Sequence, residues 1–194
     1  MHARALTLSL VAVLGSVTTS HAATWMNETN TTLEADFCNL QFPSSFSGVA
    51  LTPSPVVFGR IYEDGVTSPG GPSAFVSAEV GYGPNNSDPR TDPNWLWFPA
   101  SFNIQVGNDD EYQSIFTLPA NNGTYNYTYR FSLDGGTTLT AADLNGAGSN
   151  ASLTFETTQL GVFTVTGGLV PEPSAIALLS LPTALLMRRR RAMR

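Results

Sequence analysis

Two acidic loop segments are the first residues of this chain whose types and spacing could do chemistry. One runs Asn108-Asp109-Asp110-Glu111, and the other runs Asp143-Leu144-Asn145-Gly146. Both offer the carboxylate and carbonyl oxygens that Ca²⁺ prefers. The second lacks the further acid and the closing Glu that complete a calcium loop, and solvated turns are the alternative. The calcium candidates are Asp109, Asp110, Glu111, Asp143 and Asn145, and no other cofactor is indicated.

A pair of tryptophans is the second chemical feature. Trp95 and Trp97 occupy alternate positions, which places both rings on one face of a strand. With Tyr82 and Tyr112 they form a candidate platform for stacking a sugar ring. Core packing is the alternative, because large aromatic side chains are usually buried. Exposed indoles would favour carbohydrate binding, whereas buried indoles would argue against it.

The side chains of most nucleophilic and acid–base catalysis are missing from the central region. The two histidines, His2 and His21, lie near the amino end, and the chain has no lysine. A Ser-His-Asp or Cys-His arrangement and imidazole ligation of zinc are therefore excluded there. Cys38 is single, so it forms no intrachain disulfide; a buried thiol is the favoured interpretation, and an intermolecular link is the alternative. We expect a non-enzymatic protein.

Charge excludes a further class of partner. Between residues 23 and 170, fourteen acidic residues face only three arginines, which gives a net charge of −11. Nucleic acid carries the same sign of charge, so it is not expected as a partner. The region is also long enough for one domain with a core of its own.

The elements that must position these residues are short strands. Alternating apolar residues and turn signals predict an all-β, antiparallel β-sandwich, immunoglobulin-like in broad architecture, with a jelly roll as the alternative. The segment 23–34 is expected to be a flexible lead-in or a weak edge strand. The expected strands are 37–42, 56–62, 74–82, 95–104, 112–118, 125–131, 153–157 and 162–165, with an acidic turn at 107–111 and loops at 83–94 and 143–150.

Both ends of the chain carry targeting patterns. Residues 1–22 combine a weakly basic start, an apolar stretch at 5–17 and the small-residue site Ser20-His21-Ala22 before Ala23, which is typical of a signal peptide. We therefore expect an amino-terminal signal helix, export through the Sec machinery and cleavage by signal peptidase. The carboxyl end reads Pro171-Glu172-Pro173-Ser174, then an apolar run at 175–187, then Arg188, Arg189, Arg190 and Arg191.

The apolar run is short for a permanent span. Thirteen helical residues cover roughly 20 Å, against a hydrocarbon core of about 30 Å, and Pro182 interrupts them. A short transmembrane helix held transiently in the inner membrane, with the arginines on the cytoplasmic side, fits better. An ordinary tail anchor is the alternative.

This three-part tail resembles the PEP-CTERM sorting signal of Gram-negative bacteria. The resemblance rests on Pro171, Glu172, Pro173 and Ser174 followed by the apolar run and the arginine cluster. It implies recognition by an exosortase, a membrane cysteine transpeptidase that cuts near the motif and removes the tail. The expected organisation is a signal peptide at 1–22, an extracellular β-sandwich at 23–169 and a sorting tail at 170–194.

The central region also resembles small β-sandwich modules of secreted bacterial proteins, some of them similar to starch-binding modules. The resemblance rests on Gly81-Tyr82-Gly83, Trp95-Leu96-Trp97, the 107–112 segment, Asp134-Gly135-Gly136 and the 143–146 segment. Leu139 stands where that pattern usually has an aromatic residue after the Asp-Gly-Gly turn.

The sequence thus predicts an exported, non-enzymatic protein of the cell surface or extracellular matrix, sorted and cleaved by an exosortase. A structural or adhesive role in exopolysaccharide or biofilm is the first interpretation. A carbohydrate-binding module that uses Trp95 and Trp97, and a calcium-dependent adhesin, are the alternatives.

Overall fold

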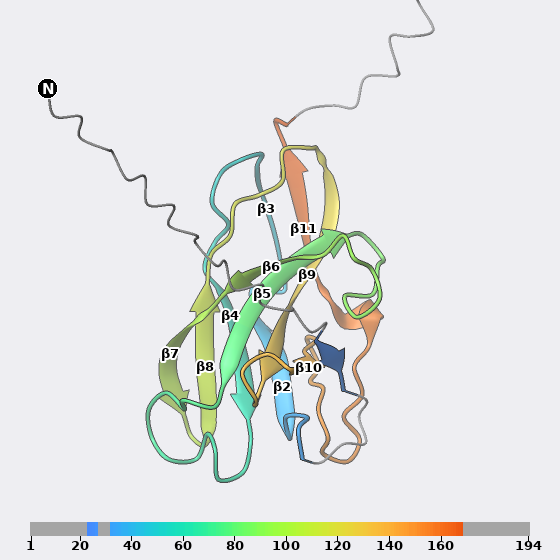
Figure 1. Cartoon of the computed structure of the whole chain (residues 1–194). Helices are drawn as coiled ribbons and strands as arrows, with labels where there is room; N and C mark the ends of the chain where they lie inside the picture. The colour runs from blue at the N-terminus through green and yellow to red at the C-terminus, as the bar shows by residue number, and fades with distance from the viewer. Residues whose placement is uncertain (1–22, 27–31, 169–194) are drawn as a thin grey trace, which may run out of the picture.

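The computed structural model describes residues 23–26 and 32–168, which form a β-sandwich of two sheets (Figure 1). A single turn of 3-10 helix, η1 (Thr157–Gln159), is the only helical element in these ranges. No helix within them is long and apolar enough to cross a bilayer. The predicted signal helix, sorting motif, membrane helix and arginine cluster lie outside the described residues.

The smaller sheet has four antiparallel strands in the order β2-β4-β8-β7. They are β2 (Phe37–Phe42), β4 (Val57–Tyr62), β8 (Asp109–Ser114) and β7 (Ser101–Val106). Strand β2 has the predicted range and β4 begins one residue later than predicted, because the aromatic residues of both and the β-branched residues of β4 favour strands.

The larger sheet is built around β9 (Gly123–Ser132). One edge of β9 pairs with β5 (Ser77–Pro84), which in turn pairs with β6 (Leu96–Pro99). The other edge is shared by β11 (Gly161–Thr166) and β10 (Thr138–Ala141). Two parallel pairs complete the sheet, β3 (Ser45–Val49) on β11 and β1 (Thr24–Trp25) on β10, so the sheet is mixed.

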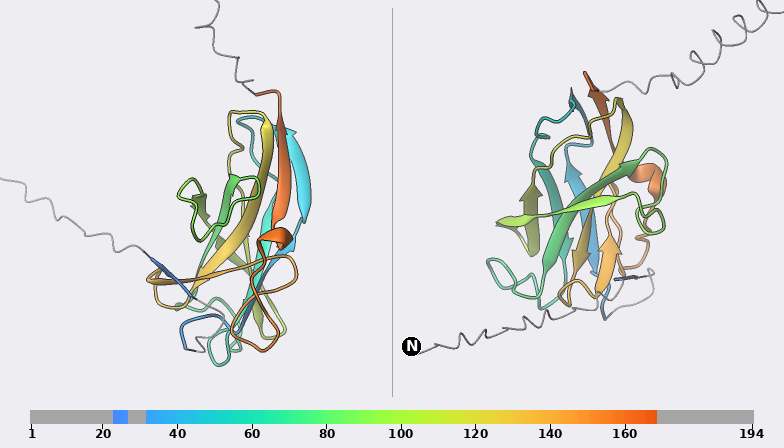
Figure 2. Two further views of the ribbon diagram at one scale, coloured as in Figure 1. Left: turned by 90° about the vertical axis from the view of Figure 1, so that its right-hand side faces the viewer. Right: turned by 45° about the horizontal axis from the view of Figure 1, so that its top comes forward.

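Strand β9 supplies the centre of the core, as its sequence predicts. Tyr127, Tyr129 and Phe131 alternate along the strand, and all three are fully buried between the sheets. Phe163 on β11 is equally buried and lies among aromatic rings from four other segments. The side views in Figure 2 show β9, β11 and β3 running side by side.

Several predicted elements have different bounds in the structure. The expected strand 95–104 is two strands, β6 and β7, which belong to different sheets and are separated at Ala100. The segment 153–157 forms no strand and leads into η1. Strands β3 and β10 were not predicted, because Ser-Phe-Ser-Gly-Val and Thr-Leu-Thr-Ala are short and flanked by turn-forming residues.

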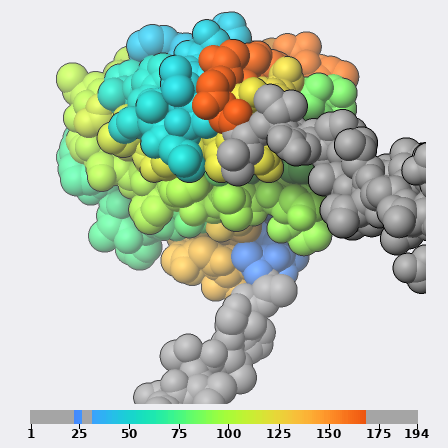
Figure 3. All heavy atoms as spheres, turned by 90° about the horizontal axis from the view of Figure 1, so that it is seen from above, coloured from blue at the N-terminus to red at the C-terminus, as the bar shows by residue number. Residues whose placement is uncertain are grey.

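The end of β11 marks one end of the sandwich. Ala50 donates its backbone N–H to the carbonyl of Thr166, and Gly168 donates its N–H to Oδ1 of Asn122 at 2.6 Å. Figure 3, which looks onto this end, shows the residues near position 50 beside the last residues of β11. Strand β1 pairs with β10 and lies toward the opposite end of the molecule (Figure 1).

Candidate functional site

Two glycines of β5 create room for indole rings on the outer face of the larger sheet. The register pairs Gly81 with Trp97 and Tyr82 with Leu96, and Gly83 is the next residue of β5. A β-carbon on Gly81 would lie 2.4 Å from Cε3 of Trp97, and one on Gly83 would lie 2.4 Å from Nε1 of Trp95. Only glycine therefore allows both rings to lie directly on the strand.

Trp95 and Trp97 share one face, as their spacing predicts. Their ring centroids are 5.6 Å apart, and the planes are nearly parallel. Nε1 of Trp95 donates a hydrogen bond to Oγ of Ser87 at 2.8 Å, which holds that ring under the 85–95 loop. Trp95 is 5% exposed, whereas Trp97 is half-buried. The burial of Trp95 argues against it as a ring for stacking a sugar, whereas Trp97 retains exposed surface on the outer face of the larger sheet.

Two residues that sequence reasoning missed extend this row of rings. The guanidinium carbon of Arg130 lies 4.2 Å from the ring centroid of Trp97 and 5.9 Å from that of Trp25. The Trp25 and Trp97 centroids are 5.9 Å apart. The arginine therefore lies close to two indoles, in the arrangement that cation–π attraction favours. Trp25 lies 70 residues before Trp95 in the chain. No local sequence pattern therefore predicts that its ring lies beside that of Trp97.

These rings form one wall of an open groove of about 350 Å³, and the Pro89–Pro93 segment faces them. We call it the tryptophan groove. It is lined by Trp25, Pro89, Arg90, Thr91, Asp92, Pro93, Trp95, Trp97 and Arg130.

Both arginines of the tryptophan groove are held by carboxylates. Arg130 pairs with Glu79 at 2.6 Å across the β5–β9 register, and Arg90 pairs with Asp88 at 3.0 Å. Burial alone would raise the pKa of Asp88, but the hydrogen bonds and charge of Arg90 outweigh it and lower that pKa. Asp88 is therefore ionised at neutral pH, so it neutralises Arg90 and fixes its side chain.

The two tyrosines of the predicted platform are elsewhere. Tyr82 is on the inner face of β5, 8% exposed, and its ring packs near Phe98, Phe116 and Phe163. Tyr112 is 5% exposed and meets Phe102 and Phe131 edge to face. The four-residue platform is therefore wrong. Alternation along a strand places Tyr82 on the opposite face from Gly81 and the indole above it.

The acidic segment is also corrected. Asp109, Asp110 and Glu111 begin strand β8, and only Gly107 and Asn108 form the turn. Successive side chains of a strand point to opposite faces, so Asp110 projects away from the other two carboxylates. Glu111 lies near Arg60, at 3.6 Å, and accepts a 2.6 Å hydrogen bond from Asn103.

The second calcium candidate segment uses its carboxylate to shape a loop. Asp143 is fully buried, and its two oxygens accept backbone N–H bonds from Gly146 at 2.7 Å and Glu156 at 2.8 Å. Asn145 is exposed on the same loop. Strands β2 and β4 separate this loop from Glu111 on β8. Among residues 23–26 and 32–168, no three Asp, Glu, Cys or His side chains gather closely enough to hold a metal ion.

Asp110 is a buried carboxylate that lacks hydrogen bonds of normal geometry to its oxygens within the described residues. No part of the residue is exposed to solvent. Burial raises its pKa, the neighbouring charge of Asp109 adds to this, and a weak interaction with the Ser73 backbone offsets part of the rise. The folded protein therefore binds a proton here more tightly than the unfolded chain, whose Asp pKa is about 3.9.

We expect Asp110→Asn to stabilise the protein at pH 7 by about 1 to 3 kcal/mol, because it removes a buried charge that lacks a partner. Wild-type stability contributed by this group is fully present below about pH 4 and falls as pH rises through the raised pKa. Asparagine does not titrate, so the gain should shrink toward pH 4. Thermal melts at several pH values measure this. The exposed carboxylate variant Glu156→Gln is the control, and a lower melting temperature for Asp110→Asn at pH 7 would contradict the assignment.

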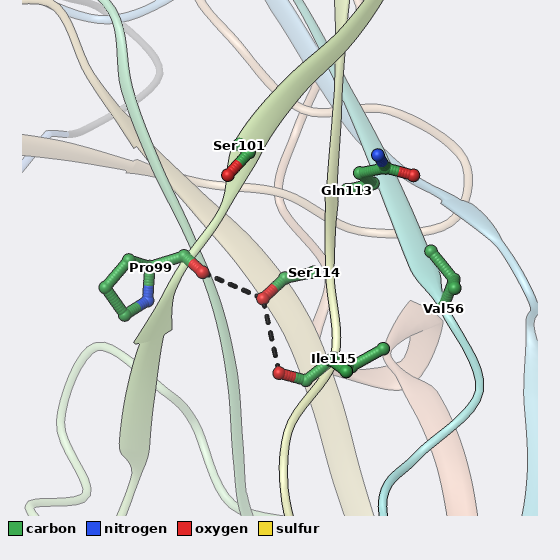
Figure 4. A pocket seen from close by; sticks show the side chains of 6 residues that line it. All are labelled: Val56, Pro99, Ser101, Gln113, Ser114 and Ile115. Atoms are coloured by element: carbon green, nitrogen blue, oxygen red, sulfur yellow. Dashed lines mark hydrogen bonds between the residues drawn. The ribbon is translucent and has the colours of Figure 1, made fainter.

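A second hollow of about 440 Å³ lies where β6, β7 and β8 meet. Figure 4 shows the Ser114 hydroxyl within it, donating a hydrogen bond to the carbonyl of Pro99 at 2.8 Å. Its remaining lining residues are Val56, Ser101, Gln113 and Ile115. The lining contains no charged side chain and no stacked ring, in contrast to the tryptophan groove.

Comparison with protein-family models finds no match, and comparison with curated proteins finds none either.

Proposed function

We propose that this protein is a non-enzymatic exported protein that an exosortase sorts and cleaves through its carboxyl-terminal tail. It passes through an inner-membrane intermediate and is delivered to the cell surface or extracellular matrix. There its β-sandwich acts as a structural or adhesive component of exopolysaccharide or biofilm material. Within the sandwich class, we propose an immunoglobulin-like architecture, with a jelly roll as the alternative.

The observation that carries this proposal is the order of features at the end of the domain. Strand β11 ends at Thr166, and the Pro171–Ser174 motif begins five residues later, followed by the apolar run and four arginines. The motif is thus separated from a folded strand by a short segment only. A cutting enzyme at the membrane would meet the motif just outside the bilayer and release the whole sandwich.

The chemistry of the domain supports a role without catalysis. Asp143 accepts hydrogen bonds from backbone amides. Glu111 accepts a hydrogen bond from Asn103 and lies near Arg60, and Glu79 forms an ion pair with Arg130. These carboxylates serve the fold, and no histidine or lysine occurs between residues 23 and 168 to work with them.

Deleting residues 171–194 is expected to remove the protein from the surface or matrix fraction. The tail supplies the membrane stop and the cut site, so the shortened protein should instead appear free in the compartment it is exported to. Immunoblotting of cell fractions and mass spectrometry of the product measure the location and both ends of the chain.

Two further variants sharpen this experiment. Alanine at Pro171, Glu172 and Pro173 keeps the apolar run but should leave an uncut product in the membrane fraction, with the mass of the tail retained. Thr158→Ala, an exposed change in η1, should leave sorting unchanged. An unaltered location after deletion of 171–194, or a wild-type product that retains the mass of the tail, would refute the proposal.

A further inference from the structure

All three tryptophans of the chain lie in the tryptophan groove, together with two of the three arginines found between residues 23 and 168. Trp25 and Trp97 are both half-buried, so each indole retains surface. Trp25 comes from β1 and Trp97 from β6, and β10, β9 and β5 separate these strands in the sheet. The fold therefore concentrates its largest rings at one place on its outer surface, although the core between the sheets already has many aromatic residues.

The charge of the groove restricts the ligand. Arg90 and Arg130 are each paired with a carboxylate, and Asp92 adds another acid to the lining. The two cations are thus offset by Asp88, Glu79 and Asp92, within a domain that is strongly acidic as a whole. A polyanion would be repelled by this surplus of negative charge, whereas a neutral ligand would not.

The polarity of the groove restricts the ligand further. Indole surfaces offer apolar contact, whereas the guanidinium groups donate hydrogen bonds and the Asp92 carboxylate accepts them. The Thr91 hydroxyl can do both. A ligand that matches must have an apolar face and a rim of hydroxyl groups that both donate and accept. The volume of about 350 Å³ is at the lower end of ligand sites, so it suits a short segment of a longer chain.

We propose that the tryptophan groove binds a neutral carbohydrate chain, with a sugar ring against the indoles of Trp25 and Trp97 and its hydroxyl groups on Arg90, Thr91 and Asp92. This inference deepens the adhesive role proposed above and rests on it. The two remain separable, because sorting is read from location and mass, whereas sugar binding is read from the purified protein.

The test uses the protein purified from its own cells and two direct readouts. The first is migration in native gels cast with a soluble neutral polysaccharide, such as hydroxyethyl cellulose, a mixed-linkage β-glucan or galactomannan, with alginate as the anionic comparison. The second is tryptophan fluorescence, which reports on this groove alone because no other tryptophan exists. We expect slower migration in at least one neutral polysaccharide, none in alginate, and a shift of the emission on binding.

Two variants separate binding from folding. Trp25→Ala should weaken binding roughly tenfold, the equivalent of about 1.4 kcal/mol, through loss of one stacking ring. Thr91→Trp leaves every existing ring in place and fills the groove with a new indole. It should therefore abolish polysaccharide binding without changing the melting temperature. Phe75→Ala, an aromatic that is 69% exposed and lies outside the groove, should bind as the wild type does.

Three outcomes would overturn the inference. The first is unchanged migration in all three neutral polysaccharides, and the second is equal binding by Thr91→Trp and the wild type. The third is retardation by alginate only, which would assign the groove to an anionic ligand. If Trp25→Ala lowers the melting temperature and the wild type binds none of the polysaccharides, the row of rings serves only to fasten β1 to the sheet.

Discussion

Phe163→Ala is expected to destabilise the domain by about 3 to 5 kcal/mol, the usual cost of removing a fully buried aromatic ring. The ring stacks on Phe46 and Tyr125, with centroids 5.1 and 5.2 Å away, and meets Tyr82 edge to face at 5.7 Å. These partners come from β3, β9 and β5, so one cavity would loosen three neighbouring strands at once. The loss is a large fraction of the stability of an ordinary domain.

Urea unfolding of both proteins measures this difference. The control is Val162→Ala, because Val162 is the preceding residue on β11, points to the opposite face and is 36% exposed. It should cost far less. A loss below about 1 kcal/mol for Phe163→Ala would mean that the surrounding rings collapse into the space, and the central role given to this residue would be wrong.

Gly59→Ala is expected to destabilise the domain by about 2 to 3 kcal/mol, through overpacking rather than a cavity. A β-carbon at Gly59 would lie 2.6 Å from Cγ of Tyr129. That ring has no room to retreat, since Tyr129 is fully buried and its hydroxyl donates a 2.7 Å hydrogen bond to the carbonyl of Val57. Strands β4 and β9, which lie in different sheets, would have to separate locally.

Gly70→Ala is the matched control for this change. A β-carbon at Gly70 meets no atom within 4 Å, so the same substitution there should be close to neutral. Thermal melts of the two variants and the wild type give the comparison. Equal melting temperatures for Gly59→Ala and Gly70→Ala would show that the two sheets are not in tight contact at Tyr129.

The sequence predicted the central strands because their patterns are strong and local. Alternating aromatics at 125, 127, 129 and 131 predict β9 and its buried face, whereas aromatic and β-branched residues between turn signals predict β2 and β4. The acidic residues at the start of β8 predict a turn, because Asp and Glu are rare in strands and favour loops. Pairing with β4 and β7 on both sides overrides that local preference.

The site was predicted only in part, for a physical reason. The shared face of Trp95 and Trp97 follows from their spacing, but their partners Trp25 and Arg130 are brought there by strand pairing over long sequence distances. A signal was nevertheless present. Gly81 and Gly83 alternate along β5 as the two tryptophans do, and glycines in that register leave the space that rings can fill.

The pairing of β11 has a mechanical consequence. Its residues 161–165 bond to β9, and its residues 162–166 bond to β3, so both edges of this last described strand are engaged. Tension applied after Gly168 would act along the strand, across the perpendicular hydrogen bonds to β9 and the slanted hydrogen bonds to β3, and would load both rows in shear together. Strand β1 has only two paired residues and would peel away under a much smaller pull. A pull at the carboxyl end would therefore be resisted along both edges of β11, whereas a pull at the amino end would meet only the short β1–β10 pairing.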